Sequence, residues 1–165
     1  MIEIGVVGEY DAEVAEAMGE LLCALSSSYN GEAVARERIE EIIESPWHDI
    51  MVAFDGEELV GMASLSVIMG TKIGRNLYLE DLVVKAGKQG QGIGSLLWEK
   101  ILEWGRKKGC KRLEFTSSGK GKKQGAVDFY LAKGAEIRET NCFRVELGSG
   151  LQIGEGGGFE LGEGK

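Results

Sequence analysis

Apolar and polar residues recur with two different periods along this chain. Apolar side chains return every three or four positions in residues 11–25 and 93–104, which predicts amphipathic helices. Shorter runs rich in β-branched residues predict strands, and the turn signal Asp55-Gly56 joins two of them into a hairpin. In chain order we expect strands at residues 2–7, 50–54, 59–69, 77–84, 113–116 and 142–147, with further helices at 32–44 and 126–133.

This succession of elements fits a single domain over residues 1–147. The chain has 165 residues, of which 43% are hydrophobic and 28% charged, and these values exclude wholesale disorder. Residues 148–165 differ because eight of these 18 are glycine, and we expect a flexible tail or a small hairpin there. No stretch approaches a membrane span and no charged-then-apolar leader opens the sequence, so we expect a cytoplasmic protein without a membrane partner.

Charge is distributed unevenly along the chain. Residues 1–58 carry 15 acidic and two basic side chains, whereas residues 85–123 carry 11 basic and three acidic ones. Solvation accounts for most single charges, but the asymmetry also suggests partners of opposite sign. A net charge of −8, with no cluster of stacking aromatics beside the lysines, argues against nucleic acid. We expect a small anion near the basic segment and, as a hypothesis, a cationic molecule near the acidic one.

The sequence offers little for metal or thiol chemistry. Cys23, Cys110 and Cys142 are scattered, and His48 is the single histidine, so no metal site is predicted. No cysteine has a nearby histidine that could activate it, and we expect all four side chains to be structural.

The segment after the strand at 77–84 is rich in glycine. Gly90, Gly92 and Gly94 let the backbone approach a ligand closely, and unpaired N–H groups at a helix start favour a phosphate. The segment lacks the closing Gly-Lys-Ser/Thr of a P-loop. Its glycines also follow a hairpin rather than the first strand, unlike a dinucleotide-binding fingerprint. A plain structural turn is the alternative interpretation.

Two blocks in this order resemble the signature of the GNAT N-acetyltransferase superfamily. They are Gln89-x-x-Gly92-x-Gly94 after Leu79-Glu80-Asp81-Leu82-Val83-Val84, and Ala126-Val-Asp-Phe-Tyr130-Leu-Ala-Lys-Gly134-Ala135. The resemblance covers about residues 2–147, and the run Tyr78-Leu-Glu-Asp also looks like the polyamine (spermidine/spermine) acetyltransferase branch. It implies an α+β fold with a mixed, mostly antiparallel central sheet of about six to seven strands, splayed in the middle and flanked by about four helices.

The resemblance further implies acetyl-CoA as cosubstrate, bound without a metal between two splayed strands. Lys123 stands where the compared branch has an asparagine that touches the cofactor, and Lys85 and Lys88 would screen its phosphates. The implied cofactor-binding residues are Leu82, Val83, Val84, Gln89, Gly90, Gln91, Gly92, Ile93, Gly94, Ser95 and Lys123.

Acetyl transfer to an amine needs a base and an acid. An alkyl amine with a pKa of about 10 is only ~0.1% neutral at pH 7, so a base must take its proton. Glu80 is the candidate base, acting through water, and Tyr130 the candidate acid for the departing thiolate. Adjacent strand residues point to opposite faces, so only one of Glu80 and Asp81 should line a given side of the cleft. Alternatively, both are polar residues at a strand bulge, and Tyr130 is a core aromatic beside Phe129.

We therefore expect an N-acetyltransferase that moves the acetyl group of acetyl-CoA to a primary amine of a small, cationic acceptor by direct attack. Two other functions stay open: a protein N-terminal or lysine acetyltransferase, and a non-catalytic CoA-binding regulatory module. The resemblance also leaves a homodimer open.

Overall fold

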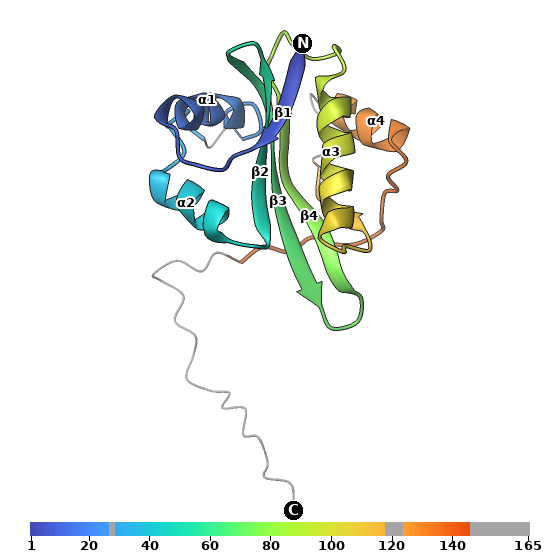
Figure 1. The fold of residues 1–165 in the computed structure, drawn as a ribbon. Coiled ribbons are helices and arrows are strands. Elements are labelled where there is room, and N and C mark those ends of the chain that lie inside the picture. Colours follow the sequence, from blue (N-terminus) through green and yellow to red (C-terminus); the bar gives the residue numbers. More distant parts are fainter. Residues whose placement is uncertain (27–28, 118–123, 146–165) are drawn as a thin grey trace, which may run out of the picture. The chain divides into compact units, whose positions relative to one another are not determined.

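The computed structural model describes residues 1–26, 29–117 and 124–145, which fall into two units (Figure 1). In the first, Met1–Ser118, the elements are β1 (Ile2–Val6), α1 (Ala12–Leu22), α2 (Arg36–Glu44), β2 (His48–Asp55), β3 (Glu58–Gly70), β4 (Gly74–Val84), α3 (Ile93–Lys107) and β5 (Leu113–Glu114). In the second, Gly119–Lys165, the described element is α4 (Gln124–Ala132).

The strands of the described chain form one five-stranded sheet in the order β1-β2-β3-β4-β5. β1 to β4 pair antiparallel and β5 runs parallel to β4, so the predicted mixed, mostly antiparallel α+β class is confirmed. The sheet has fewer strands than the six to seven expected. Within the predicted strand at 142–147, residues 142–145 belong to no strand and the last two lie outside the described residues.

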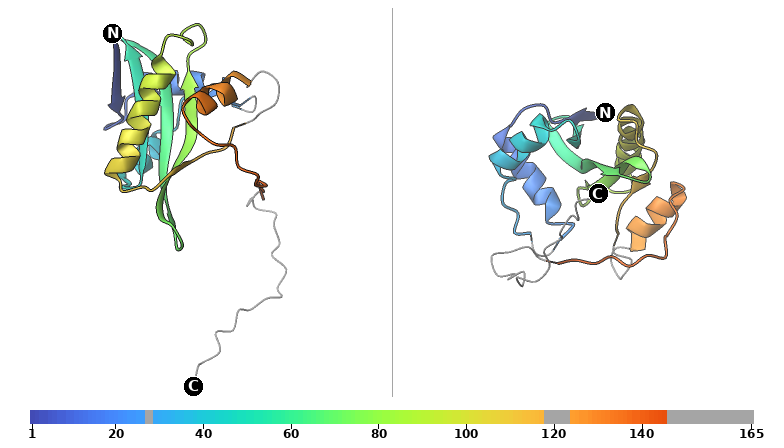
Figure 2. Two further views of the ribbon diagram at one scale, coloured as in Figure 1. Left: turned by 90° about the vertical axis from the view of Figure 1, so that its right-hand side faces the viewer. Right: turned by 90° about the horizontal axis from the view of Figure 1, so that it is seen from below.

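Helices cover both faces of the sheet. α1 and α2 lie on one face and α3 on the other, as the views of Figures 1 and 2 show. On the first face, Met18 and Ile39 of the helices join Met62 and Val83 in the main hydrophobic cluster. On the other, Leu97, Ile101 and Trp104 are buried on the inner side of α3. No helix in the described ranges has the length and hydrophobicity to span a bilayer.

The helix expected at 32–44 begins only at Arg36. The preceding residues dock on α1 in an irregular conformation. The Val34 amide donates to the Ala15 carbonyl at 3.0 Å, and the Val34 side chain is buried. This tertiary contact replaces the first turn that the sequence pattern predicts, because it satisfies the backbone and buries the apolar side chain at once.

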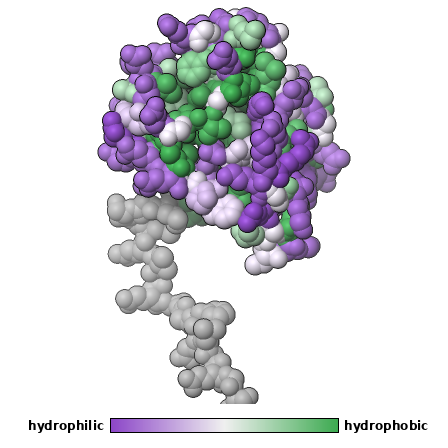
Figure 3. Space-filling model, in the orientation of Figure 1, coloured by the Kyte–Doolittle hydropathy of each residue, from purple (hydrophilic) through white to green (hydrophobic). Residues whose placement is uncertain are grey.

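The carboxylates of the two N-terminal helices point to solvent. Glu13, Glu16 and Glu20 of α1 are exposed, as are Glu37 and Glu41 of α2. Figure 3 shows hydrophilic residues over these helices and apolar residues toward the middle of the view. These exposed carboxylates of α1 and α2 therefore help to keep the surface solvated.

Gly19 is the position where α1 and the segment before α2 approach most closely. A Cβ on Gly19 would lie 2.1 Å from the carbonyl oxygen of Glu32, a backbone atom with little freedom to move. We expect Gly19→Ala to lower the free energy of unfolding by about 1–3 kcal/mol, the usual range for overpacking. Urea denaturation measures this. Gly5→Ala is the matched control, since nothing lies within 4 Å of its Cβ. If both substitutions lowered the free energy of unfolding equally, the overlap between a Cβ on Gly19 and the Glu32 carbonyl oxygen would be contradicted.

Candidate active site

The outer edge of β4 is open beyond its first residues. β5 pairs with β4 at Leu77 and Tyr78 alone. Across residues 79–84, no strand in the described part of the chain pairs with this edge. Parallel neighbours that pair at two positions and then separate leave main-chain N–H and C=O groups available to a ligand.

Strand register decides which groups face this open edge. The Lys85 amide donates to the carbonyl of Val60 in β3 at 2.9 Å, so Lys85 and Val60 form a hydrogen-bonded pair. Bonded and non-bonded pairs alternate in an antiparallel ladder, which assigns the N–H and C=O of Val83 to β3 as well. The same alternation turns those of Leu82 and Val84 outward. Val83 instead contributes its side chain to the core.

A β-bulge in β4 redirects two carboxylates. The pairs on either side are Ser64↔Asp81 and Leu65↔Leu79, so Glu80 is an extra residue without a register partner. The Ser66 hydroxyl donates to a Glu80 carboxylate oxygen at 3.3 Å. Ser64 and Ser66 follow Met62 at two-residue spacing, and Met62 packs against α1. Glu80 and Asp81 therefore both point to the α1/α2 side of the sheet.

The expectation that only one of these carboxylates lines a given side is wrong for this reason. Strict alternation of side chains holds in a regular strand, whereas the two residues of a bulge share one partner and one face. The Glu80 side chain is exposed and that of Asp81 half-buried, so the bulge presents paired carboxylates at the point where β4 leaves β5.

A glycine-rich loop links β4 to α3. Gly90 and Gly92 have φ of +77° and +85°, a region that disfavours other residues, and no atom lies within 4 Å of a Cβ built on either. The first helical bond of α3 runs from the Leu96 amide to the Gly92 carbonyl at 3.0 Å. The amides of residues 93–95 precede it and have no helical acceptor, and Gly92 supplies no side-chain cap. With the helix dipole, this open surface suits an anion.

Two glutamines fold the loop back on itself. Gln89 Nε2 donates to the Val84 carbonyl and Gln91 Nε2 to the Gly87 carbonyl, each at 3.2 Å. The first bond agrees with the outward orientation of Val84. The predicted site residues Gln89 and Gln91 thus act on the loop's own backbone.

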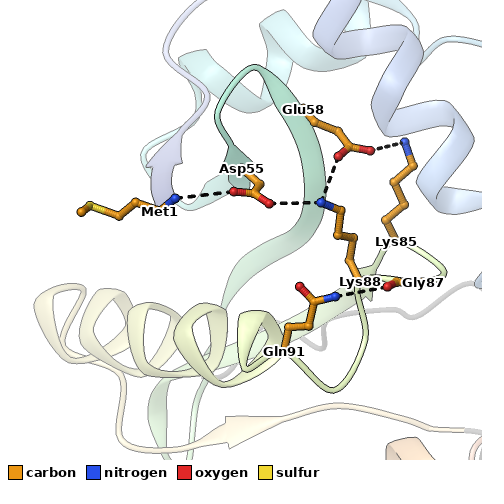
Figure 4. A network of polar contacts seen from close by, with 7 residues as sticks. All are labelled: Met1, Asp55, Glu58, Lys85, Gly87, Lys88 and Gln91. Carbon is orange, nitrogen blue, oxygen red and sulfur yellow. Dashed lines mark hydrogen bonds and ion pairs between the residues drawn. The ribbon is translucent and has the colours of Figure 1, made fainter.

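The two lysines of the loop reach the β2–β3 turn, not the surface of the glycines (Figure 4). Lys88 Nζ lies 3.1 Å from Asp55 Oδ2 and 3.2 Å from Glu58 Oε2, and Lys85 Nζ lies 2.9 Å from Glu58 Oε1. We call Asp55, Glu58, Lys85 and Lys88 the turn–loop network. The hydrogen bond from Lys88 lowers the pKa of Asp55, and bonds from Lys85 and then Lys88 lower the pKa of Glu58. The bond to Asp55 is the main cause that raises the pKa of Lys88.

A surface cavity of about 400 Å³ lies beside this network, between α1 and the β2–β3 turn. Its walls include Leu21, Leu59 and Lys85. Lys85 follows Glu80 by five residues, which is about 16 Å along a strand. The cavity is therefore distinct from the paired carboxylates of the bulge.

In the second unit, α4 carries Tyr130. Its ring lies edge-on to that of Phe129, with centroids 5.4 Å apart, and burial raises the pKa of the phenol above its usual value of 10.0. The helix ends at Ala132, and the φ of +84° at Gly134 beyond it allows the Ala135 amide to reach the Tyr130 carbonyl at 3.0 Å. A phenol in this state is protonated at neutral pH and can donate a proton.

Most predicted site residues therefore lie on one strand–loop–helix segment, residues 80–95. Tyr130 lies in the second unit, and Lys123 lies outside the described residues. Sequence reasoning missed Asp55 and Glu58. The Asp55-Gly56 signal predicts the turn between two strands but not the loop that this turn meets. No group of three or more metal-ligating side chains occurs among the described residues.

Comparison with known proteins identifies the family and the fold. The Acetyltransferase (GNAT) family matches residues 16–135, which confirms the family resemblance. A thialysine N-epsilon-acetyltransferase of Bos taurus is 36% identical over 112 residues, which span 66% of this chain and 62% of the bovine protein. The match thus covers less than two thirds of that relative's length.

Two solved structures show the same fold. An aminoglycoside acetyltransferase from an uncultured soil metagenomic sample, in complex with sisomicin, has a TM-score of 0.74 at 20% identity, over 88% of this chain and 96% of that one. An aminoglycoside N-acetyltransferase in complex with CoA has a TM-score of 0.72 at 19% identity, over 89% and 95% of the two chains.

The turn–loop network predicts a pH-dependent contribution to stability. The pKa of Glu58 is lowered from 4.5 in the folded protein, so its ion pairs stabilise the fold above about pH 4.5 and are lost as the pH falls through the lower folded value. We expect Glu58→Gln to be less stable than wild type at pH 7, with a difference that shrinks below pH 4.5, as measured by urea denaturation across pH. Glu57→Gln is the control, because Glu57 belongs to none of these ion pairs. A Glu58→Gln difference that does not change with pH would contradict this assignment.

Proposed function

This chain belongs to the GNAT acetyltransferase family, and we propose that it transfers the acetyl group of acetyl-CoA to a primary amine of a small cationic acceptor. The anion-binding surface at the start of α3 is the observation that carries the proposal. A diphosphate matches it because unpaired amides of residues 93–95 stand beside glycines whose missing side chains leave the surface open.

The open edge of β4 fits the rest of such a cosubstrate. Leu82 and Val84 turn main-chain groups outward on the same strand that leads into the loop. An amide-containing arm could add to this edge as a strand does, with its diphosphate at residues 90–95 and its thioester toward Glu80. When bound, acetyl-CoA supplies an electrophilic thioester and a thiolate leaving group.

Glu80 is the proposed general base. Deprotonation of an amine with a pKa near 10 costs ~4 kcal/mol at pH 7. The exposed carboxylate of Glu80 at the bulge would accept the proton of the acceptor ammonium through one water and pass it on to solvent. Asp81 lies on the same face, and a second carboxylate there favours a cationic acceptor.

Tyr130 is the proposed general acid. Its role rests on the sequence motif and on the raised pKa, which keeps the phenol protonated in the neutral range. It would donate its proton to the sulfur as the amine nitrogen bonds to the acetyl carbon. No covalent enzyme intermediate is required, since the amine attacks the thioester directly.

The names of the similar proteins support an amine acceptor. The curated relatives are thialysine N-epsilon-acetyltransferases, and the structural neighbours include aminoglycoside acetyltransferases. Thialysine and aminoglycosides are both small cationic amines. The paired carboxylates of the bulge suit this class better than they suit a neutral acceptor.

Calorimetry with CoA tests the anion-binding surface. Gly92→Ala puts a Cβ on the surface that the diphosphate would approach, so we expect the dissociation constant of CoA to rise about tenfold, or ~1.4 kcal/mol, beyond any effect of the backbone strain at a φ of +85°. Gly109→Ala is the matched control: its φ of +73° gives the same backbone strain beyond the far end of α3. Equal losses of affinity in the two variants would mean that strain alone is responsible.

A thiol-release assay with a panel of acceptors tests the reaction. We expect release of CoA with thialysine, polyamines or aminoglycosides. Tyr130→Phe and Glu80→Gln should each lower kcat by about 10²-fold or more, without weakening the affinity for CoA. In Glu80→Gln the rate should keep rising with pH toward the acceptor's pKa, because only the free amine then reacts.

Other results of the same assay would identify the alternatives. Release with peptides alone would indicate a protein acetyltransferase, and CoA binding without release under any acceptor would indicate a regulatory module. Asp81→Asn separates the two carboxylates: a loss equal to that of Glu80→Gln, with the same pH profile, would contradict the choice of Glu80 as base.

A further inference from the structure

The loop that carries the unpaired amides is rich in glycine, a composition that favours a flexible backbone. Gly87, Gly90 and Gly92 all have positive φ within six residues, and a Cβ on any of them would meet nothing within 4 Å. Glycine loses more conformational entropy on ordering than other residues do, so a defined loop needs contacts that hold it. The glutamine bonds described above link the loop only to itself and to the end of β4.

The turn–loop network connects the loop to a separate part of the fold. Lys88 lies within the loop, between Gly87 and Gly90, and its ammonium bridges Asp55 at the end of β2 and Glu58 at the start of β3. The Lys88 side chain is 29% exposed and that of Asp55 35%, compared with 53% and 45% for the Lys100–Glu103 pair of α3. Lys88 and Asp55 are thus less exposed to solvent than Lys100 and Glu103, so salt weakens their attraction less.

The same contacts direct the lysine charges away from a bound phosphate. Each oxygen of Glu58 accepts one lysine, Oε1 from Lys85 and Oε2 from Lys88, and Asp55 takes a second contact from Lys88. The N-terminal ammonium of Met1 lies 3.6 Å from the other oxygen of Asp55, so the two carboxylates face three ammonium groups. The interpretation that Lys85 and Lys88 screen the cofactor's phosphates does not fit these distances, and the amides supply the attraction instead.

We propose that Lys88 is a positioning residue for CoA: by tying the glycine loop to the β2–β3 turn, it holds the amides of residues 90–95 in their binding geometry. This rests on the proposed function, because it names what orients that same site. Lys88 acts through the loop backbone and makes no contact with the diphosphate.

A positioning role and a direct phosphate contact predict opposite results for Asp55→Asn. If Lys88 positions the loop, loss of the Asp55 charge loosens the loop and weakens CoA binding. If Lys88 touched phosphate, the same substitution would free its ammonium and strengthen binding. An asparagine before Gly56 favours a hairpin turn as the aspartate does, so the substitution leaves the turn itself intact.

The experiment measures CoA affinity by calorimetry, together with kcat and KM for acetyl-CoA. We expect Lys88→Met and Asp55→Asn each to raise the dissociation constant about two- to fivefold, the range for a partly shielded ion pair. The double variant should lose no more than Lys88→Met alone, because removal of the Lys88 ammonium already breaks its contacts with both Asp55 and Glu58. The value of kcat at saturating acetyl-CoA should not change, and Lys88→Arg should restore affinity.

Lys100→Met is the matched control, since it breaks an ion pair of 2.9 Å on α3 outside the loop. Its CoA affinity should equal that of wild type, and thermal unfolding of all variants should remain close to wild type. Tighter binding by Asp55→Asn, unchanged affinity in both single variants, or an equal loss in Lys100→Met would each overturn the proposal. Absence of CoA binding by wild type would overturn the proposed function itself.

Discussion

The arrangement of the site follows from one constraint on β4: the main-chain groups along its two edges differ in their hydrogen-bond partners. Along one edge, β3 takes the main-chain bonds through to Lys85. Along the other, β5 pairs at Leu77 and Tyr78 and then separates. The Gln89 side chain already donates to the Val84 carbonyl, whereas the outward N–H groups of Leu82 and Val84 and the Leu82 carbonyl have no strand partner in the described part of the chain. A main-chain polar group costs free energy when it is buried without a partner. The proposed pairing with an amide-containing arm rests on this open edge, and the bulge and the glycine loop lie at its two ends.

Among the described residues, five basic side chains of residues 85–123 pair with carboxylates of the protein itself. The basic segment suggested an external anion held by lysines, yet Lys85 and Lys88 pair with the β2–β3 turn, Lys100 and Lys107 pair with Glu103, and Arg112 pairs with Glu114. The pKa of Glu103, lowered to about 2 by these two lysines, reflects such internal pairing. The unpaired amides before Leu96 offer an anion a fixed partial positive charge that does not depend on flexible side chains.

The sequence predicted the elements better than their contacts. Helical periodicity located α3, the Asp55-Gly56 turn located the β2–β3 hairpin, and the glycine spacing located the loop, because each of these is a local pattern. A strand bulge was one of two interpretations of Glu80 and Asp81, but the sequence could not decide between them, since the bulge arises from the register between β3 and β4. The partners of Lys88 were missed for the same reason: Asp55 precedes it by 33 residues. At residues 32–35, docking on α1 overrode a helical pattern.

Within residues 80–95, the glycine loop and the bulge have separate proposed tasks. In the proposed function the loop binds its anion through backbone amides, and the side chains of Gln89 and Gln91 hold the shape of the loop. The bulge, in contrast, presents side chains, and replacing Glu80 or Asp81 would change chemistry without moving the backbone. Under the proposed roles, substitution at the bulge would change acceptor preference while cosubstrate binding is kept, provided that Gly90 and Gly92 keep their left-handed backbone.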